Sequence, residues 1–150
     1  MGTFIVVVED DHLQEGPLQE QLEDAFPGAR IATVVTEQEF RDMLAVFRAD
    51  PPDIVIMDVM LRWAYPAPGA AAPPPDVVAG GYYRAGLRCA ELLLADPALC
   101  GVPVVYYTIL ERSDLERDCG QVTANRTYVR KSADPEVLNR KVRELIGVRR

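Results

Sequence analysis

The sequence predicts an α/β fold in which helices cover both faces of a doubly wound, five-stranded parallel sheet. Apolar, β-branched runs alternate five times with segments that have the period of an amphipathic helix. The runs are continuously apolar rather than alternating with polar residues, as expected for strands buried on both faces. A length of 150 residues fits one domain with its own core. We therefore expect a single domain over residues 1–150, with no output domain after it.

Five apolar runs are expected to form the strands. The first, Phe4–Val8, consists of large apolar and β-branched residues, and the third follows Pro51 and Pro52 directly. The predicted strands are residues 4–8, 30–35, 53–57, 102–107 and 127–130.

Helices are expected between the strands. Pro27–Gly28 ends the first helix, and Pro17 suggests a start close to that residue. Thr36 and Glu39 form a capping box for the second helix, and Asp134–Pro135 begins the last. The predicted apolar stripes are Leu18, Leu22, Ala25 and Phe26; Phe40, Met43, Leu44 and Phe47; Leu87, Ala90, Leu93 and Leu94; and Leu138, Val142, Leu145 and Ile146, with a further short helix at 112–119.

One segment, Ala64–Gly81, interrupts this alternation. Of its 18 residues, 14 are Ala, Pro or Gly. We interpret it as a loop inserted after the third strand, with a polyproline-type core at Pro73–Pro75. It is either an insertion without a role or a lid or partner-contact loop. The aromatic residues that border it either bind a partner helix or pack against their own domain; they are Trp63, Tyr65, Tyr82 and Tyr83.

Composition excludes several functional classes. The net charge of −7 argues against direct nucleic-acid binding, although residues 126–150 hold eight Lys or Arg and only three acids. We interpret that basic end as a solvated helix face. No apolar run is long enough for a membrane span, and no signal peptide is evident. The three cysteines, Cys89, Cys100 and Cys119, form no CxxC pair and indicate reduced, packed thiols of a cytoplasmic protein.

Charged and hydroxyl residues follow four of the predicted strands where each ends. Three acids, Glu9–Asp11, follow the first strand, and Asp58, Thr108 and Lys131 follow the third, fourth and fifth. In a flavodoxin-like strand order, 2-1-3-4-5, these four strands are neighbours, and ligands bind at the carboxyl ends of such strands. We therefore expect three carboxylates, one hydroxyl and one ammonium group to converge there.

Such a cluster has a definite chemistry. Adjacent carboxylates repel one another, and a hard divalent cation such as Mg²⁺ relieves that repulsion. One carboxylate can then act as a nucleophile toward phosphorus, while the cation, Lys131 and Thr108 contact phosphoryl oxygens. His12 also follows the acids, but a lone histidine in a first helical turn is better explained as a surface or packing residue.

Four segments together resemble the motifs of response-regulator receiver domains, the phosphoacceptor (CheY-like) part of bacterial two-component signalling. The resemblance covers roughly residues 3–147, apart from the insert. The stretch between Asp58 and Thr108 is long for the family, and the other spacings are ordinary. The segments are Val7–Asp11, Pro52–Leu61, Val102–Thr108 and Tyr128–Lys131.

The resemblance implies a role for each residue. Asp58 resembles the phosphoacceptor, and Glu9 and Asp10 resemble the acidic pair that holds Mg²⁺, with the main-chain carbonyl of Met60 as a third protein ligand. Asp11 is expected to open the first helix instead. Thr108 resembles the hydroxyl that moves to the phosphoryl group, Lys131 the lysine that pairs with it, and Tyr128 the aromatic residue of the output face.

The resemblance also implies the reaction and the partners. A histidine kinase or phosphotransfer protein would donate the phosphoryl group in a Mg²⁺-dependent transfer, and slow self-hydrolysis would follow. The chain would be a self-phosphorylating and autodephosphorylating phosphoacceptor rather than a turnover enzyme. Its downstream protein partner is not identified, and homodimerisation is left open.

Three positions depart from the family pattern. Ser132 follows the lysine where proline is common, Ile109 follows Thr108 where a small residue is usual, and Arg62 stands where many members have proline. Ile109, Ser132 and the insert favour an alternative, a receiver fold that acts as an interaction module without phosphorylation. A haloacid-dehalogenase-like phosphatase is a second alternative, but Met60 stands where that class has its second aspartate. No glycine-rich phosphate-binding loop follows a strand, which argues against nucleotide binding.

Overall fold

The computed structural model describes residues 2–119 and 126–149, which form a five-stranded parallel sheet with helices on both faces. The strand order is β2-β1-β3-β4-β5, as predicted for a flavodoxin-like fold. Each neighbouring pair is parallel, with Val8 beside Met57 and Thr108 beside Arg130. The strands are Phe4–Val8 (β1), Arg30–Val34 (β2), Ile54–Met57 (β3), Val104–Thr108 (β4) and Arg126–Arg130 (β5).

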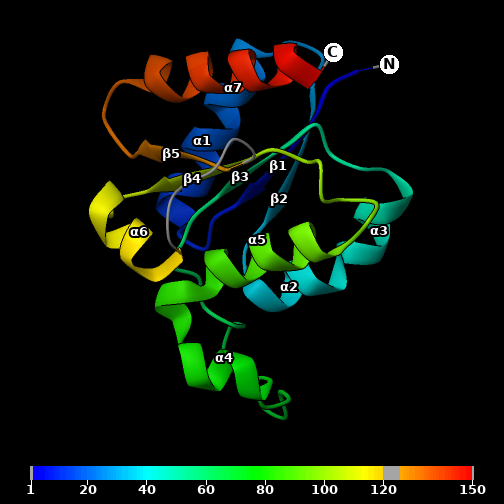
Figure 1. Cartoon of the computed structure of the whole chain (residues 1–150), viewed down its shortest axis with the longest axis vertical. Helices are drawn as coiled ribbons and strands as arrows, with labels where there is room; N and C mark the ends of the chain where they lie inside the picture. The colour runs from blue at the N-terminus through cyan, green and yellow to red at the C-terminus, as the bar shows by residue number, and fades with distance from the viewer. Residues whose placement is uncertain (1, 120–125, 150) are drawn as a thin grey trace.

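The helices form two layers around the sheet. Figure 1 shows α1 and α7 on one face and α2, α3 and α5 on the other. The helices are His12–Ala25 (α1), Glu37–Asp42 (α2), Leu44–Ala49 (α3), Pro75–Gly80 (α4), Ala85–Ala95 (α5), Arg112–Cys119 (α6) and Pro135–Arg149 (α7), with a 3-10 turn, η1, at Tyr82–Arg84. Among the described residues, no helix is long and apolar enough to cross a membrane.

Each strand contributes to two separate cores because successive side chains point to opposite faces of a sheet. Ile5 and Val7 pack in the core under α1 and α7, whereas Val6 and Val8 pack in the core under α2, α3 and α5. All five side chains of β1 are buried. The continuous apolar pattern of β1 therefore reflects burial on both faces of the sheet, as predicted.

The predicted start of the first helix was wrong. Helix α1 starts at His12 rather than near Pro17, because the Asp11 side chain accepts a hydrogen bond from the Leu13 N–H and caps the first turn. Pro17 lies inside the helix, which the cap and the burial of Leu18 on the core side keep continuous. The role of Asp11 as helix opener is confirmed.

The predicted second helix is divided in two, and one predicted core residue faces solvent. Thr36 caps α2 as predicted, but the backbone turns at Met43, where α2 ends and α3 begins. Phe40 and Phe47 are still fully buried because the turn keeps both on the sheet side. In α5, Leu94 is 48% exposed, since it lies at the margin of the stripe that buries Leu93.

The insert contains a short helix, α4, where the sequence predicted only a loop. Pro75 occupies the first helical position, where its missing N–H costs nothing, and Pro74 keeps the extended geometry expected of the proline run. Arg41 of α2 pairs with Asp76 at 2.8 Å, and Arg88 of α5 donates to the Gly81 carbonyl at 2.8 Å, so both arginines help to hold the insert against the domain. In Figure 1, α4 projects beyond α2 and α5.

The cysteines are expected to differ sharply in reactivity. Cys89 is fully buried in α5, and burial, reinforced by the negative charge of Glu37, raises the pKa of its thiol. Cys100 is exposed. Because the thiolate is the reactive form, iodoacetamide should modify Cys100 in the native protein and Cys89 only after unfolding. Peptide mapping by mass spectrometry checks this; native labelling of Cys89 would contradict the packing of α5.

The side chains of Cys119 and His12 lie outside the described residues.

Candidate functional site

Strand register brings Glu9, Asp58 and Lys131 to one edge of the sheet. Glu9 and Asp58 each follow the last residue of neighbouring strands, and the Asp58 N–H donates to the Val8 carbonyl at 2.9 Å. Lys131 follows β5 in the same way, and its N–H donates to the Thr108 carbonyl at 2.8 Å. Three side chains that lie far apart in the sequence thus meet at the carboxyl end of the sheet, as predicted.

The Lys131 ammonium group joins the two carboxylates. Its Nζ lies 2.8 Å from Glu9 Oε2 and 2.9 Å from Asp58 Oδ2. It also donates to Gln14 Oε1 of α1 at 2.6 Å. Sequence reasoning missed Gln14, although its position three residues after the helix cap Asp11 places it on the turn that faces this edge.

Burial makes this cluster electrostatically strained. Glu9 is only 2% exposed, and burial together with the charge of Asp58 raises the pKa of Glu9 to about 7, although Lys131 acts in the opposite direction. Burial alone would lower the pKa of Lys131, but Asp58 and Glu9 raise it above its ordinary value. One ammonium group therefore does not fully offset two buried carboxylates.

The loop after β3 holds Asp58 through main-chain contacts. Asp58 Oδ1 accepts a hydrogen bond from the Val59 N–H at 2.7 Å. The Gly86 N–H of α5 donates to the Val59 carbonyl at 2.8 Å, and a Cβ atom at position 86 would lie 2.1 Å from the Asp58 carbonyl oxygen. The start of α5 thus rests directly on the backbone of Asp58. Gly86 was not identified from the sequence. The feature that could have identified it is a glycine at the start of an apolar helix.

Asp10 lies apart from this cluster and faces the start of the insert. Its Oδ2 accepts the Arg62 N–H at 2.9 Å and lies 3.4 Å from Arg62 Nε. The Tyr65 hydroxyl donates to the Asp10 carbonyl at 3.2 Å, and the Arg62 guanidinium lies 4.7 Å from the centre of the Tyr65 ring. The structure therefore places Asp10 against Arg62 rather than beside Lys131.

Thr108 and Tyr128 both contact the backbone of Leu110. Thr108 is fully buried, and its Oγ1 accepts the Leu110 N–H at 3.2 Å. The Tyr128 hydroxyl donates to the Leu110 carbonyl. Burial, more than the nearby Glu111, raises the pKa of Tyr128. The two predicted switch residues are thus linked through one loop residue, and neither touches Asp58 in the contacts described.

The aromatic residues around the insert divide into two pairs. Trp63 lies under the Arg41 guanidinium at 5.4 Å, and Tyr65 contacts Asp10, so both pack against their own domain. Tyr82 and Tyr83 are 50% and 61% exposed, with ring centres 4.2 Å apart. Packing within the domain is therefore confirmed for the first pair only.

The donor set at this edge fits a hard divalent cation in part. Residues 2–119 and 126–149 contain no ready-made group of three His, Cys, Asp or Glu side chains that could hold a metal ion. However, burial and then the negative charge of Asp58 raise the pKa of Glu9, and a cation between the two carboxylates would offset both effects. Both side chains supply the oxygen ligands that Mg²⁺ prefers. Asp10 would complete the set if its carboxylate left Arg62.

Two hollows open at opposite edges of the sheet. A groove of about 490 Å³ runs beside Lys131 and Gln14, with Leu13 and Ile109 on its walls, and those two side chains are 85% and 60% exposed. Ile109 thus lies in the same groove as Lys131. Ser132 lines the same groove.

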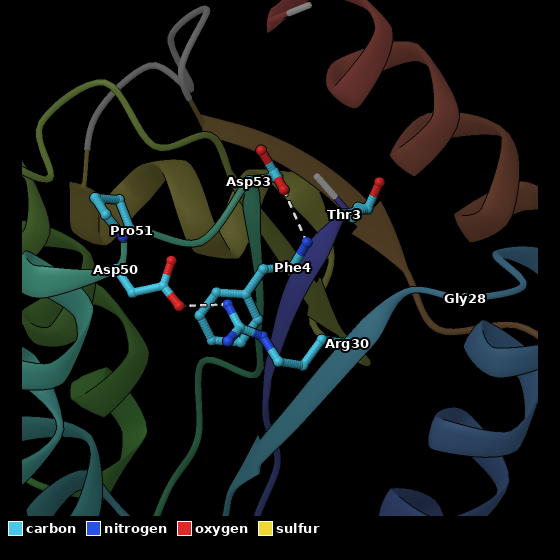
Figure 2. A pocket seen from close by; sticks show the side chains of 8 residues that line it. Thr3, Phe4, Gly28, Arg30, Asp50, Pro51 and Asp53 are labelled. Carbon is cyan, nitrogen blue, oxygen red and sulfur yellow. Dashed lines mark hydrogen bonds and ion pairs between the residues drawn. The ribbon is translucent and has the colours of Figure 1, made fainter.

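The second hollow, of about 550 Å³, lies at the amino ends of the strands. Figure 2 shows the Arg30 guanidinium over the Phe4 ring and paired with Asp50, while Asp53 accepts the Phe4 N–H. Because Arg30 pairs with Asp50 and Asp53 already accepts a main-chain hydrogen bond, we interpret this hollow as structural.

Solved structures match the chain over almost its whole length, whereas no family model and no curated protein does. The signal receiver domain of a signal transduction histidine kinase from Syntrophus aciditrophicus is 24% identical, with a TM-score of 0.69 over 98% of this chain and 92% of that one. The receiver domain of a sensor histidine kinase from Pseudomonas aeruginosa, with a magnesium ion in its active-site cleft, is 20% identical, with a TM-score of 0.68 over 98% and 99%. A sensor protein from Polaromonas sp. is 18% identical, with a TM-score of 0.71 over 97% of both chains. The chain therefore has the fold of signal receiver domains.

Proposed function

We propose that this chain is a phosphoacceptor receiver domain of two-component signalling, in which Asp58 accepts a phosphoryl group from a histidine kinase or phosphotransfer protein. The observation that carries the proposal is the contact of Lys131 Nζ with both Glu9 and Asp58 at the carboxyl end of the sheet. An ammonium group beside a carboxylate nucleophile is suited to hold a phosphoryl oxygen as that carboxylate attacks phosphorus.

In the proposed transfer, an Asp58 carboxylate oxygen forms a bond to phosphorus while the bond from phosphorus to the donor nitrogen breaks. The Val59 N–H holds Asp58 Oδ1 at 2.7 Å and so orients the nucleophile. Lys131 would move from the carboxylates to a phosphoryl oxygen. Mg²⁺, held by Glu9, Asp10, Asp58 and the Met60 carbonyl, would supply neutralisation of the phosphoryl charge.

The contacts of Leu110 support a route from Asp58 to a partner-binding face. For Thr108 to bond a phosphoryl oxygen, its hydroxyl would turn from the Leu110 N–H. The Leu110 carbonyl accepts a hydrogen bond from the Tyr128 hydroxyl. A shift of this loop would therefore move or break that hydrogen bond and change the position of the Tyr128 side chain. The modified site would thus bias the loop between two states that a downstream protein distinguishes.

The groove beside Lys131 offers a path for the phosphodonor. Exposed apolar side chains on its walls, Leu13 and Ile109, suit contact with another protein. A donor histidine that enters here would meet Asp58 from the Lys131 side.

Intact-mass measurement tests the function. Incubation with Mg²⁺ and acetyl phosphate should add the mass of one phosphoryl group to the wild-type chain. Asp58→Asn should add none, because an amide is not a nucleophile toward phosphorus, and a chelated wild-type sample should also remain unmodified. An adduct of equal yield on Asp58→Asn would refute Asp58 as the acceptor.

A second candidate function is an interaction module that works without phosphorylation. The contact of Asp10 with Arg62 favours it, because that carboxylate is already paired. This candidate predicts no adduct in the same measurement and no heat of Mg²⁺ binding in a calorimetric titration.

A further inference from the structure

We propose that Arg62 is an internal counter-ion that competes with a divalent cation for Asp10 and thereby sets the metal affinity of the site. The inference rests on the proposed function, because it assigns Asp10 to a metal. It goes beyond that function by naming a residue of the insert boundary as the determinant of metal affinity.

The contacts of Asp10 show why the two cations would compete. The main-chain N–H and the guanidinium Nε of Arg62 both approach Asp10 Oδ2, at 2.9 Å and 3.4 Å. A metal ion on this carboxylate would use the same oxygen lone pairs and would repel the guanidinium charge. Metal binding is therefore favoured when the Arg62 side chain moves away from Asp10.

The Arg62 side chain is about half exposed, whereas main-chain hydrogen bonds hold its backbone. The Arg62 carbonyl accepts the Glu37 N–H at 3.0 Å, and the Trp63 carbonyl accepts the Gln38 N–H at 2.9 Å, so the start of α2 holds this segment. The Arg62 side chain is 48% exposed, and the Tyr65 ring lies under its guanidinium at 4.7 Å. A side-chain rotation, without refolding of the loop, would thus take the guanidinium away from Asp10, while Asp10 Oδ2 would keep the hydrogen bond from the Arg62 main-chain N–H.

The balance of charge at the site indicates that removing Arg62 would favour metal binding. Lys131 contacts Glu9 and Asp58, and Arg62 contacts Asp10, so two cations share three carboxylates. With Arg62 in place, a divalent cation would bring two further positive charges close to both Lys131 and Arg62. Without the Arg62 side chain, Asp10 would lose its guanidinium partner and keep the hydrogen bond from the main-chain N–H of residue 62, so the metal would not compete with that positive charge.

Calorimetric titration with Mg²⁺ tests the inference on four chains. Arg62→Gln should bind Mg²⁺ about two- to fivefold more tightly than the wild type, the range expected when one exposed ionic contact is removed. Arg62→Lys keeps the charge and should stay near the wild type. Arg30→Gln removes a charge from an exposed pair at the opposite edge of the sheet and should bind like the wild type.

Unchanged or weaker Mg²⁺ binding by Arg62→Gln, with an unfolding midpoint like that of the wild type, would overturn the inference. So would equal tightening by Arg30→Gln, since it would assign the effect to net charge. The acetyl phosphate measurement on the same chains separates the two proposals. If Asp58 is modified but Arg62→Gln does not tighten Mg²⁺ binding, the inference alone fails; if no chain is modified, the proposed function fails.

Discussion

Replacement of Gly86 by alanine is expected to lower the free energy of unfolding by about 3 kcal/mol, the upper end of the usual cost of overpacking. The added Cβ would lie 2.1 Å from the Asp58 carbonyl oxygen and 2.8 Å from the Val59 Cα atom. Both are backbone atoms, so no flexible side chain can move aside. The start of α5 must shift away from the β3 loop, which also displaces Asp58. Urea denaturation measures the loss of stability, and intact mass after acetyl phosphate tests whether the proposed phosphorylation of Asp58 is lost with it.

Gly16→Ala is the matched control for that replacement. Gly16 lies inside α1, and a Cβ atom there would have no neighbour within 4 Å. Alanine has the higher helix propensity, so this variant should gain about 0.5–1 kcal/mol. If Gly86→Ala proved as stable as Gly16→Ala, the close approach of α5 to the Asp58 backbone would be refuted.

Replacement of Arg88 by methionine is expected to cost about 3 kcal/mol because it leaves a buried carboxylate short of a partner. Glu37 is fully buried, and Arg88 contacts both of its oxygens, with Nη2 at 2.6 Å from Oε1 and Nε at 2.9 Å from Oε2. Arg41 still contacts Glu37 at 3.0 Å, so the expected loss is at the lower end of the range for such breaks. Loss of the Arg88 bond to the Gly81 carbonyl would also loosen the insert.

Two further variants separate the causes of this loss. Arg117→Gln breaks an exposed pair with Asp114 and should change stability by less than about 1 kcal/mol. Glu37→Met in the Arg88→Met background removes the uncompensated charge and should restore much of the stability, while Arg41 keeps Asp76. If the double variant were no more stable than Arg88→Met alone, lost packing rather than buried charge would be the cause. Urea denaturation of the four chains provides the comparison.

Local patterns in the sequence were sufficient for the fold and for much of the candidate site. The continuous apolar run at Phe4–Val8 predicts a strand buried on both faces, and all of its side chains are buried. The capping residues Thr36 and Asp11 begin their helices as predicted. Because parallel strands end at a common edge, the residues that follow them predicted the meeting of Glu9, Asp58 and Lys131.

The same patterns did not predict contacts between segments that no periodicity relates. Pro17 suggested a late helix start, but the side-chain cap at Asp11 and burial of one helix face outweighed the lost hydrogen bond. The proline run suggested that the whole insert is a loop, yet the insert contains the helix α4, and Asp76 of that helix pairs with Arg41 of α2. In both cases the outcome depends on packing between elements rather than on the preference of one residue.

The sequence by itself determined the alternation of strands and helices, the edge at which the charged residues gather and the chemistry of which they are capable. These properties follow from hydrophobic period and residue type, which are local. Only the tertiary structure decided that Arg62 faces Asp10 and that Gly86 lies against the backbone of Asp58. Those contacts depend on the path of the insert between β3 and α5, which is set by packing between distant segments.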